Sequence, residues 1–275
     1  MLRKGPVYIF FCILLVSVTF KPLMAQDISK KNDRDIIIKA GITLNKINVK
    51  DESFTAIPYS GWKPGFLFSL IIRKQTALQE LSINCNSGKL SMESFPGQAL
   101  QHLFVDVDYA RLYKINGSET APFQWLAGGN LDLVYTRRDY KQFVNRNNSF
   151  EFAVSLGLVS EVAYDFQNGI FSNIAIKDRI SIPLISLLNQ PAFGSEQPEG
   201  NLNGEGYTVG AFLKSSSIAS FSSYLRIKNS LAIEKSISET QLLSFQYWWD
   251  YYQVSGNNSV KQAIHSLGIT YQITF

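Results

Sequence analysis

Acidic and basic side chains recur at even spacing in two consecutive stretches of this chain. Glu151, Glu161 and Asp165 occupy odd positions in the first stretch, and Lys177 and Arg179 occupy odd positions in the second. In an extended strand, residues an even number apart lie on the same face. Charges held away from water need partners of opposite sign. We therefore expect these five residues to form an ion-pair network between two neighbouring strands.

Other stretches add charged residues to the same polar face. Acidic residues dominate the middle of the chain, and basic residues follow them. If all of them face one enclosed space, ion pairs and hydrogen bonds fill it. The alternative is a narrow polar conduit that passes small solutes. The additional residues are Lys39, Arg73, Glu80, Asp106, Asp108, Asp132, Arg226 and Lys228.

A hydrolytic site is the competing class of chemistry, and it needs a histidine near a carboxylate or serine. Of the two histidines, His265 falls on the apolar face of its stretch, and His102 shares a face with Asp106. Positions four apart on a strand are about 13 Å apart, which is too far for a direct dyad. The sequence contains no recognisable nucleophile or metal motif. We expect no enzyme activity, no cofactor and no bound metal, and a hydrolase using His102 remains the less favoured alternative.

The last stretch of the chain shows what positions these residues. From residue 263 to the final Phe275, apolar side chains alternate with small or hydroxyl-bearing ones almost without a break. A strand with an apolar face and a polar face, in a chain that begins with a secretory signal, is typical of a transmembrane β-barrel. The sequence thus predicts an all-β, antiparallel transmembrane barrel.

Similar alternation predicts ten strands, with eight or twelve as alternatives. Several exceed a dozen residues, whereas strands of a soluble β-sandwich usually have about 5–6. Long connections are expected at 50–61, 89–98, 138–147 and 189–217, alternating with short ones. The expected strands are 36–49, 62–74, 76–88, 99–114, 122–137, 148–166, 169–188, 218–234, 239–254 and 260–275.

The stretch 169–188 fits the alternation least well. Asp178 falls among isoleucines on the apolar face, and Pro183 lacks a backbone donor for the strand pairing. Either a β-bulge turns Asp178 inward, or the residues of this stretch are assigned to the wrong faces of the strand. Both interpretations stay open at this point.

Residues 1–25 have the layout of a cleaved signal peptide. Two basic residues precede an apolar run from Val7 to Phe20, and Ala25 precedes the expected cut. A membrane-anchoring helix is the alternative, but the run is shorter than the roughly 20 residues such a helix needs. Residues 26–35 then form a short polar lead, and 36–275 form the barrel.

The charge balance excludes nucleic acid as a partner. The whole chain has 26 basic and 22 acidic residues. The signal peptide removes three basic residues and no acidic one, which leaves a net charge of about +1. A nucleic-acid-binding surface needs a strongly basic balance or patch, and this chain lacks that balance.

Two of the expected outer connections could contact other molecules. Arg137, Arg138, Lys141 and Arg146 form a basic outer-rim loop suited to the phosphates of lipopolysaccharide, although a solvated rim explains them equally well. The connection 189–217 is rich in Gly and Pro. It is either a solvated loop, a lid over the barrel mouth or a contact for a protein partner.

Both ends of the chain carry a resemblance to a known family. The run Lys39-Ala40-Gly41-Ile42-Thr43-Leu44-Asn45 and the ending Tyr271-Gln272-Ile273-Thr274-Phe275 resemble outer-membrane barrels of Bacteroidota, of the PorT-like kind within the OmpA-like barrels. The Ala25-Gln26 pair at the expected cleavage site is similar as well. The resemblance implies a barrel wall and identifies no activity.

Together these features predict a protein of the bacterial outer membrane with both termini in the periplasm. Its role is expected to be structural, binding or assembly-related, with the small-solute pore as the alternative. The lipid bilayer is the expected surrounding. Tyr271, Ile273 and Phe275 are expected to form the insertion signal for the barrel-assembly machinery.

Overall fold

The computed structural model describes residues 34–52, 55, 57–115, 122–140, 148–190, 216–255 and 259–275. The predicted signal peptide and nearly all of the polar lead lie outside the described residues. So do Lys141, Arg146 and most of the 189–217 connection. Among the described residues, no helix is long and apolar enough to cross a membrane.

Strands make up nearly all of the described structure, and most of them are long. Their lengths follow from the alternation in the sequence, which continues through each strand to the turn. The elements are β1 (Arg34–Asp51), β2 (Tyr59–Lys74), β3 (Ala77–Met92), β4 (Phe95–Lys114), β5 (Phe123–Tyr140), β6 (Asn148–Asp165), the 3-10 turn η1 (Gly169–Phe171), β7 (Ile174–Asn189), β8 (Ser217–Ala219), β9 (Tyr224–Ser236), β10 (Gln241–Val254) and β11 (Val260–Thr274).

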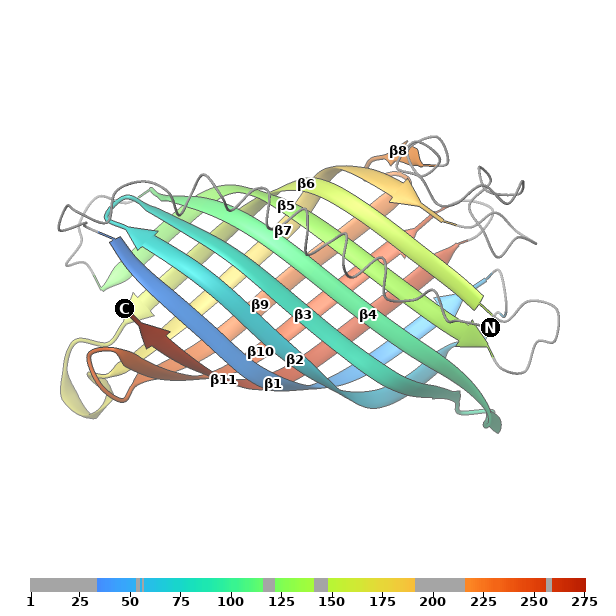
Figure 1. Ribbon diagram of the computed structural model, residues 1–275, viewed down its shortest axis with the longest axis horizontal. Helices are drawn as coiled ribbons and strands as arrows, with labels where there is room; N and C mark the ends of the chain where they lie inside the picture. Colours follow the sequence, from blue (N-terminus) through green and yellow to red (C-terminus); the bar gives the residue numbers. More distant parts are fainter. Residues whose placement is uncertain are drawn as a thin grey trace. The chain divides into compact units, whose positions relative to one another are not determined.

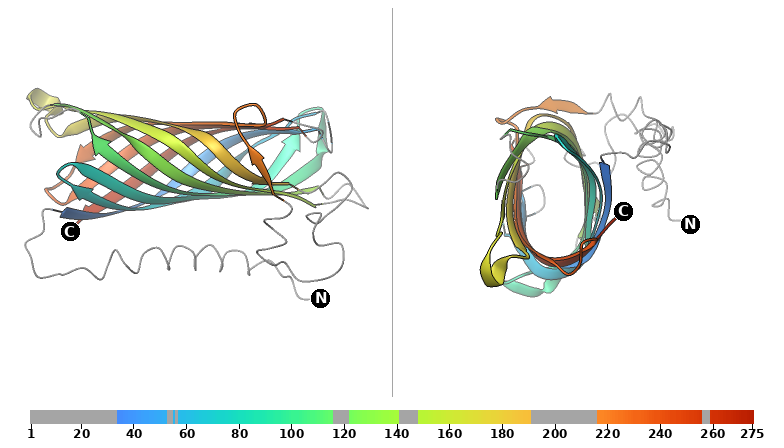
Figure 2. Two further views of the ribbon diagram at one scale, coloured as in Figure 1. Left: turned by 90° about the horizontal axis from the view of Figure 1, so that it is seen from above. Right: turned by 90° about the vertical axis from the view of Figure 1, so that its left-hand side faces the viewer.

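The ten long strands close into an antiparallel barrel (Figure 1). The first and last strands lie side by side, with Ile37–Asp51 of β1 paired to Val260–Thr274 of β11. At the other junction, β7 joins β6 to β9, and the short β8 pairs only with the end of β7. Seen along its axis, the barrel is oval rather than round (Figure 2). We call the end where β1 begins and β11 ends the Phe275 end.

The predicted barrel of ten strands is confirmed, with three local differences. The predicted strand 169–188 starts later, because residues 169–171 form η1 and Gly169 has a φ of +77°, which favours glycine. The predicted strand 218–234 is split into β8 and β9. The predicted long connection 89–98 is wrong, since β3 and β4 extend to a turn at Glu93 and Ser94.

A β-bulge does lie in β7, but it does not turn Asp178 inward. Leu156 pairs with Ile185 and Gly157 pairs with Pro183, so Leu184 is the extra residue. Asp178 lies before this bulge and stays on the outer wall, where the side-chain nitrogen of Asn229 donates a hydrogen bond to it at 2.8 Å. Near the Phe275 end, a polar pair on the outer wall is less costly than at mid-height.

The outer wall of the barrel is apolar over its whole circumference. Large apolar side chains are exposed on every long strand except β3, whose outward Leu81, Ile83 and Cys85 are half-buried. The exposed ones include Ile42, Phe66, Tyr113, Leu131, Leu156, Leu158, Ile180, Leu231, Phe245 and Ile269. Water would penalise such a surface, whereas the hydrocarbon core of a bilayer matches it. The wall therefore faces lipid.

The inside of the barrel is not uniformly polar. The sequence analysis predicts only a polar interior, and it does not predict the apolar clusters found there. One cluster of buried apolar residues fills the end opposite Phe275, with Tyr59, Leu90, Phe104, Tyr140 and Tyr252 as its larger members. A second cluster lies towards the Phe275 end: Ile37, Ile71, Leu78, Ala110, Leu112 and Val159. The charged side chains lie between these two apolar layers or beside them.

The position of Leu156 gives a test of the wall assignment. It lies at the middle of β6 with 58% of its side chain exposed, so Leu156→Arg should lower the free energy of unfolding by about 2–4 kcal/mol in lipid vesicles. Tyr164→Arg, on the same face but near the strand end, should cost about 0–1 kcal/mol. Equal costs at the two positions, measured by urea unfolding, would contradict a lipid-facing β6.

Candidate functional site: the charged interior

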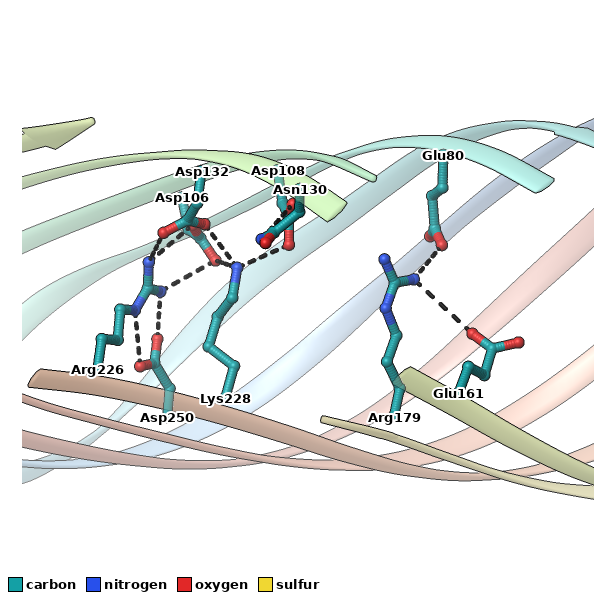
Figure 3. A network of polar contacts seen from close by, with 10 residues as sticks. All are labelled: Glu80, Asp106, Asp108, Asn130, Asp132, Glu161, Arg179, Arg226, Lys228 and Asp250. Atoms are coloured by element: carbon teal, nitrogen blue, oxygen red, sulfur yellow. Dashed lines mark hydrogen bonds and ion pairs between the residues drawn. The ribbon is translucent and has the colours of Figure 1, made fainter. Parts of the chain in front are cut away.

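Arg226 on β9 is the centre of the largest charged cluster. Its guanidinium donates two hydrogen bonds to the Asp250 carboxylate on β10, at 3.0 Å from Nε and 2.5 Å from Nη2. On the opposite wall it reaches Asp106 of β4, at 3.2 Å from Nη2, and Asp132 of β5 (Figure 3). Only 1% of Arg226 is exposed. The side chain thus spans the lumen and ties three strands to β9.

Lys228 lies two residues further along β9 and reinforces the same connection. Its Nζ is 2.7 Å from the Asp108 carboxylate and 2.6 Å from the Asp132 carboxylate. The Asn130 side chain donates a hydrogen bond to Asp108 at 3.1 Å. Arg226 and Lys228 together hold β9 against β4 and β5 across the barrel. We call the six charged residues Asp106, Asp108, Asp132, Arg226, Lys228 and Asp250 the central cluster.

A small polar cavity lies beside the central cluster. The cavity beside it has a volume of about 10 Å³, which is the room of one water molecule. Asn130, Ser155, Ser181 and Lys228 contribute polar groups to its lining. The Oδ1 atom of Asn130 is buried and has no hydrogen-bond partner among the described residues, so it can accept a bond from such a water. The space suits a single bound water and not a solute.

A second ion-pair cluster lies towards the Phe275 end. Arg179 on β7 reaches across the lumen to Glu80 on β3 at 2.5 Å, and contacts Glu161 on β6 at 3.8 Å (Figure 3). Glu161 and Arg179 are directly opposite in the pairing of β6 with β7. The structure therefore brings together one of the predicted pairs, and gives Arg179 a shorter contact across the barrel.

The other predicted members of the network have different partners. Lys177 pairs with Glu234 on β9 at 2.6 Å, and not with an acid of β6. Asp165 accepts a hydrogen bond from Gln124 at 3.4 Å, near the barrel end. Glu151 lies at the other end of β6 from Lys177 and Arg179, and it pairs with Arg138. Glu151 is therefore separated from the basic residues with which it was grouped.

The predicted outer-rim loop is also corrected. Arg138 is a residue of β5 and is fully buried, with its Nη1 atom 2.9 Å from the Asp51 carboxylate. Tyr140 donates a further hydrogen bond to Asp51 at 3.0 Å. Arg137 is the exposed neighbour, because β5 continues through both residues and places them on opposite faces. Of these two residues, only Arg137 lies on the outer wall.

His102 is inside the barrel, where the described contacts of its ring are with a lysine and an amide side chain. Its Nδ1 atom lies 2.5 Å from the Lys63 ammonium, and its Nε2 atom lies 2.9 Å from Oε1 of Gln262 on β11. Lys63 and His102 are both fully buried. A general base needs access to substrate and is normally oriented by an acid. This geometry suits a hydrogen-bonded brace across the lumen.

The predicted insertion residues lie on the outer wall. Tyr271, Ile273 and Phe275 are all exposed, and Phe275 exchanges two backbone hydrogen bonds with Ile36. His265 is on this wall too, and its Nδ1 atom is 2.7 Å from the hydroxyl of Tyr247. The predicted faces of β11 thus agree with the structure.

Several interior residues were missed, although the sequence held a signal for some. Asp51 and Arg138 are the next inward-facing positions of their strands, but both fall in the predicted connections 50–61 and 138–147. Lys63 and Glu234 share the inward face of β2 and β9. Extending each strand until its alternation stops would have found Asp51 and Arg138. Lys63 and Glu234 already lay within the predicted strands 62–74 and 218–234, on the same faces as Arg73 and Lys228.

No family model matches this sequence, and no curated protein matches it. Its fold is similar to solved outer-membrane barrels. The outer membrane protease OmpT from Escherichia coli has a TM-score of 0.45 at 8% identity, covering 91% of this chain and 99% of that one. Neisserial surface protein A has a TM-score of 0.38 at 10% identity, covering 87% and 97%. The attachment invasion locus protein Ail of Yersinia pestis has a TM-score of 0.36 at 10% identity, covering 88% and 100%.

With TM-scores below 0.5 and identities of 8–10%, these likenesses carry no argument about this chain. The class of protein follows from the chain's own structure, which combines a closed antiparallel barrel, an apolar outer wall and an interior filled by side chains. Such a structure is a membrane β-barrel. The interior is braced by ion pairs across the lumen.

Arg226 gives a direct test of the central cluster. Arg226→Met should lower the free energy of unfolding by about 3–5 kcal/mol, because it leaves buried carboxylates without a partner. Arg111→Met removes an equivalent side chain from the outer face of β4 and should cost less than about 1 kcal/mol. Adding Asp250→Asn to Arg226→Met should restore part of the loss. Similar costs for the two single variants would show that the cluster does not stabilise the barrel.

Proposed function

We propose that this chain is a non-enzymatic outer-membrane protein whose lumen is closed by its own side chains. Its role is then structural, binding or assembly-related. The observation that carries the proposal is the crossing of the lumen by Arg226, which contacts Asp250 on its own side and Asp106 and Asp132 on the other. A permeating solute would have to separate these pairs.

The layers on either side support a closed lumen. Apolar side chains cannot replace the hydration shell of an ion, and both ends of the interior contain them. Arg179 and Glu80 add a second crossing between the central cluster and the Phe275 end. A ten-stranded barrel is only slightly wider than the eight-stranded kind, whose interior is filled by its own side chains.

The described contacts of the His102 ring support a non-enzymatic role. Its ring contacts are Lys63 and Gln262, and neither is a carboxylate. We place the barrel in the bacterial outer membrane, with both termini in the periplasm, among the PorT-like barrels of Bacteroidota. The grounds are the Lys39–Asn45 run, the terminal Phe275 and the alternating strands.

Conductance separates a closed barrel from a small-solute pore. The wild-type protein in planar bilayers should give no steady ion current, with insertion confirmed by its heat-modifiable migration on gels. Arg179→Ala combined with Arg226→Ala shortens both side chains that cross the lumen, so it should raise the current above wild type. Large, stable conductance steps in the wild-type protein would overturn the closed lumen and favour the pore.

The terminal residue tests the proposed recognition by the barrel-assembly machinery. Phe275→Ser keeps the backbone bonds to Ile36 but removes the aromatic side chain from the outer wall. It should lower the amount of folded barrel in the outer membrane several-fold and increase periplasmic degradation. Phe275→Trp keeps an aromatic and should leave the amount nearly unchanged. Equal amounts of the serine and tryptophan variants would argue against an insertion signal at this residue.

A further inference from the structure

The outer wall carries one block of basic, aromatic and amide side chains at the end opposite Phe275. Three adjacent strands contribute to it. The pairing of β1 with β11 places Lys46 opposite His265, Asn48 opposite Ala263 and Lys50 opposite Lys261. The pairing of β10 with β11 continues the same rows, so the block has three rows of three residues. The β10 members are Trp249, Tyr251 and Gln253.

Two cations of this block lie on directly opposed positions of neighbouring strands. Lys50 and Lys261 are directly opposite on neighbouring strands, an arrangement that is destabilising for like charges. Glu52 forms an ion pair with Lys50 at 2.8 Å. Among the described residues no acid forms an ion pair with Lys46 or Lys261, so the block keeps an excess of positive charge. Glu52 also interacts electrostatically with Lys261, so it offsets part of the repulsion. A further anion would offset the positive charge that one acid leaves among three lysines.

The aromatic residues give the block a second kind of surface. Trp249 and Tyr251 stack with 6.3 Å between ring centroids and 18° between planes. Lys46 lies over the ring of Trp62 on β2, 5.9 Å from its centroid. Ala263 is the smallest side chain of the block and lies at its centre. Trp62 is exposed, and Trp249 and Tyr251 are half-buried. Lysines beside such aromatic rings, on a wall that turns apolar a few residues away, suit a ligand with phosphates, a polar ring and acyl chains.

We propose that this block binds the phosphorylated sugar headgroup of a membrane glycolipid. Lys50 and Lys261 contact the phosphate, and the Trp249 and Tyr251 rings cover the apolar face of the sugar. The acyl chains then lie along the apolar wall below, which includes Leu267 and Ile269. The proposal rests on the outer-membrane placement proposed above. It moves the expected lipopolysaccharide contact from the rim to the wall of β10, β11 and β1.

Native mass spectrometry of the detergent-solubilised full chain tests the block. The probes are bisphosphorylated lipid A and its dephosphorylated form. The wild-type protein should retain bisphosphorylated lipid A more strongly than the dephosphorylated form. Lys50→Gln with Lys261→Gln should weaken that retention roughly 10- to 30-fold. Trp249→Ala should weaken retention of both lipids.

The control variant removes the same charge from the other end of the wall. Lys74→Gln with Lys235→Gln changes two exposed lysines near the Phe275 end and should change retention less than about twofold. Equal losses in the two double variants would show a general charge effect and overturn the site. Displacement of lipid A by an equal concentration of inorganic phosphate would overturn the lipid assignment. Heat-modifiable migration shows that each variant is folded.

A failure of this proposal is distinguishable from a failure of the closed lumen. Lipid retention is read in detergent and does not depend on whether the barrel conducts. A wild-type barrel that conducts and still loses lipid A in the Lys50 and Lys261 variant would overturn only the closed lumen. A non-conducting barrel that retains both lipid A forms equally would overturn only the headgroup site.

Discussion

The pairing of the first strand with the last is the constraint on which the rest of the structure depends. In a bilayer, a backbone group without a hydrogen-bond partner costs several kcal/mol, so a spanning sheet cannot keep a free edge. The continuous pairing of Ile37–Asp51 with Val260–Thr274 removes that edge. Closure also divides every strand into an inner and an outer face. A charged residue on the inner face must then find its partner inside the barrel.

Inward-facing charges find partners inside the barrel because long basic side chains from one wall reach short acidic ones on the facing wall. Arg226 and Lys228 extend from β9, and the short carboxylates of Asp106, Asp108 and Asp132 face them from β4 and β5. These ion pairs show that β9 lies within side-chain reach of β4 and β5 across the lumen. Buried ion pairs contribute little net stability compared with apolar packing, but breaking one is costly. The pairs therefore fix which walls face each other, while the apolar layers at both ends add packing.

The fold could be predicted largely from the sequence, because the alternation of side chains is a local property of each strand. Ten strands and the faces of β11 came from it directly. The partners of the charged residues could not be predicted in this way. Arg179 meets Glu80 and Arg226 meets Asp132 across the lumen, and those contacts depend on strand register and on which walls of the closed barrel face each other. The bulge at Leu184 shows the same limit, since Pro183 marks an irregularity without giving its position.

The charged residues inside the barrel are ion-paired, whereas the lysines on the outer wall are only partly so. This difference indicates where the protein can bind a ligand. In the central cluster both cations already contact carboxylates, so a ligand entering the lumen would have to replace buried ion pairs. On the outer wall, by contrast, Lys50 and Lys261 face each other with one acid between them and are open to the surroundings. A ligand there gains electrostatic attraction without breaking the interior. The closed lumen and a lipid-binding wall are therefore compatible in one barrel, because the chain uses its two faces for different purposes.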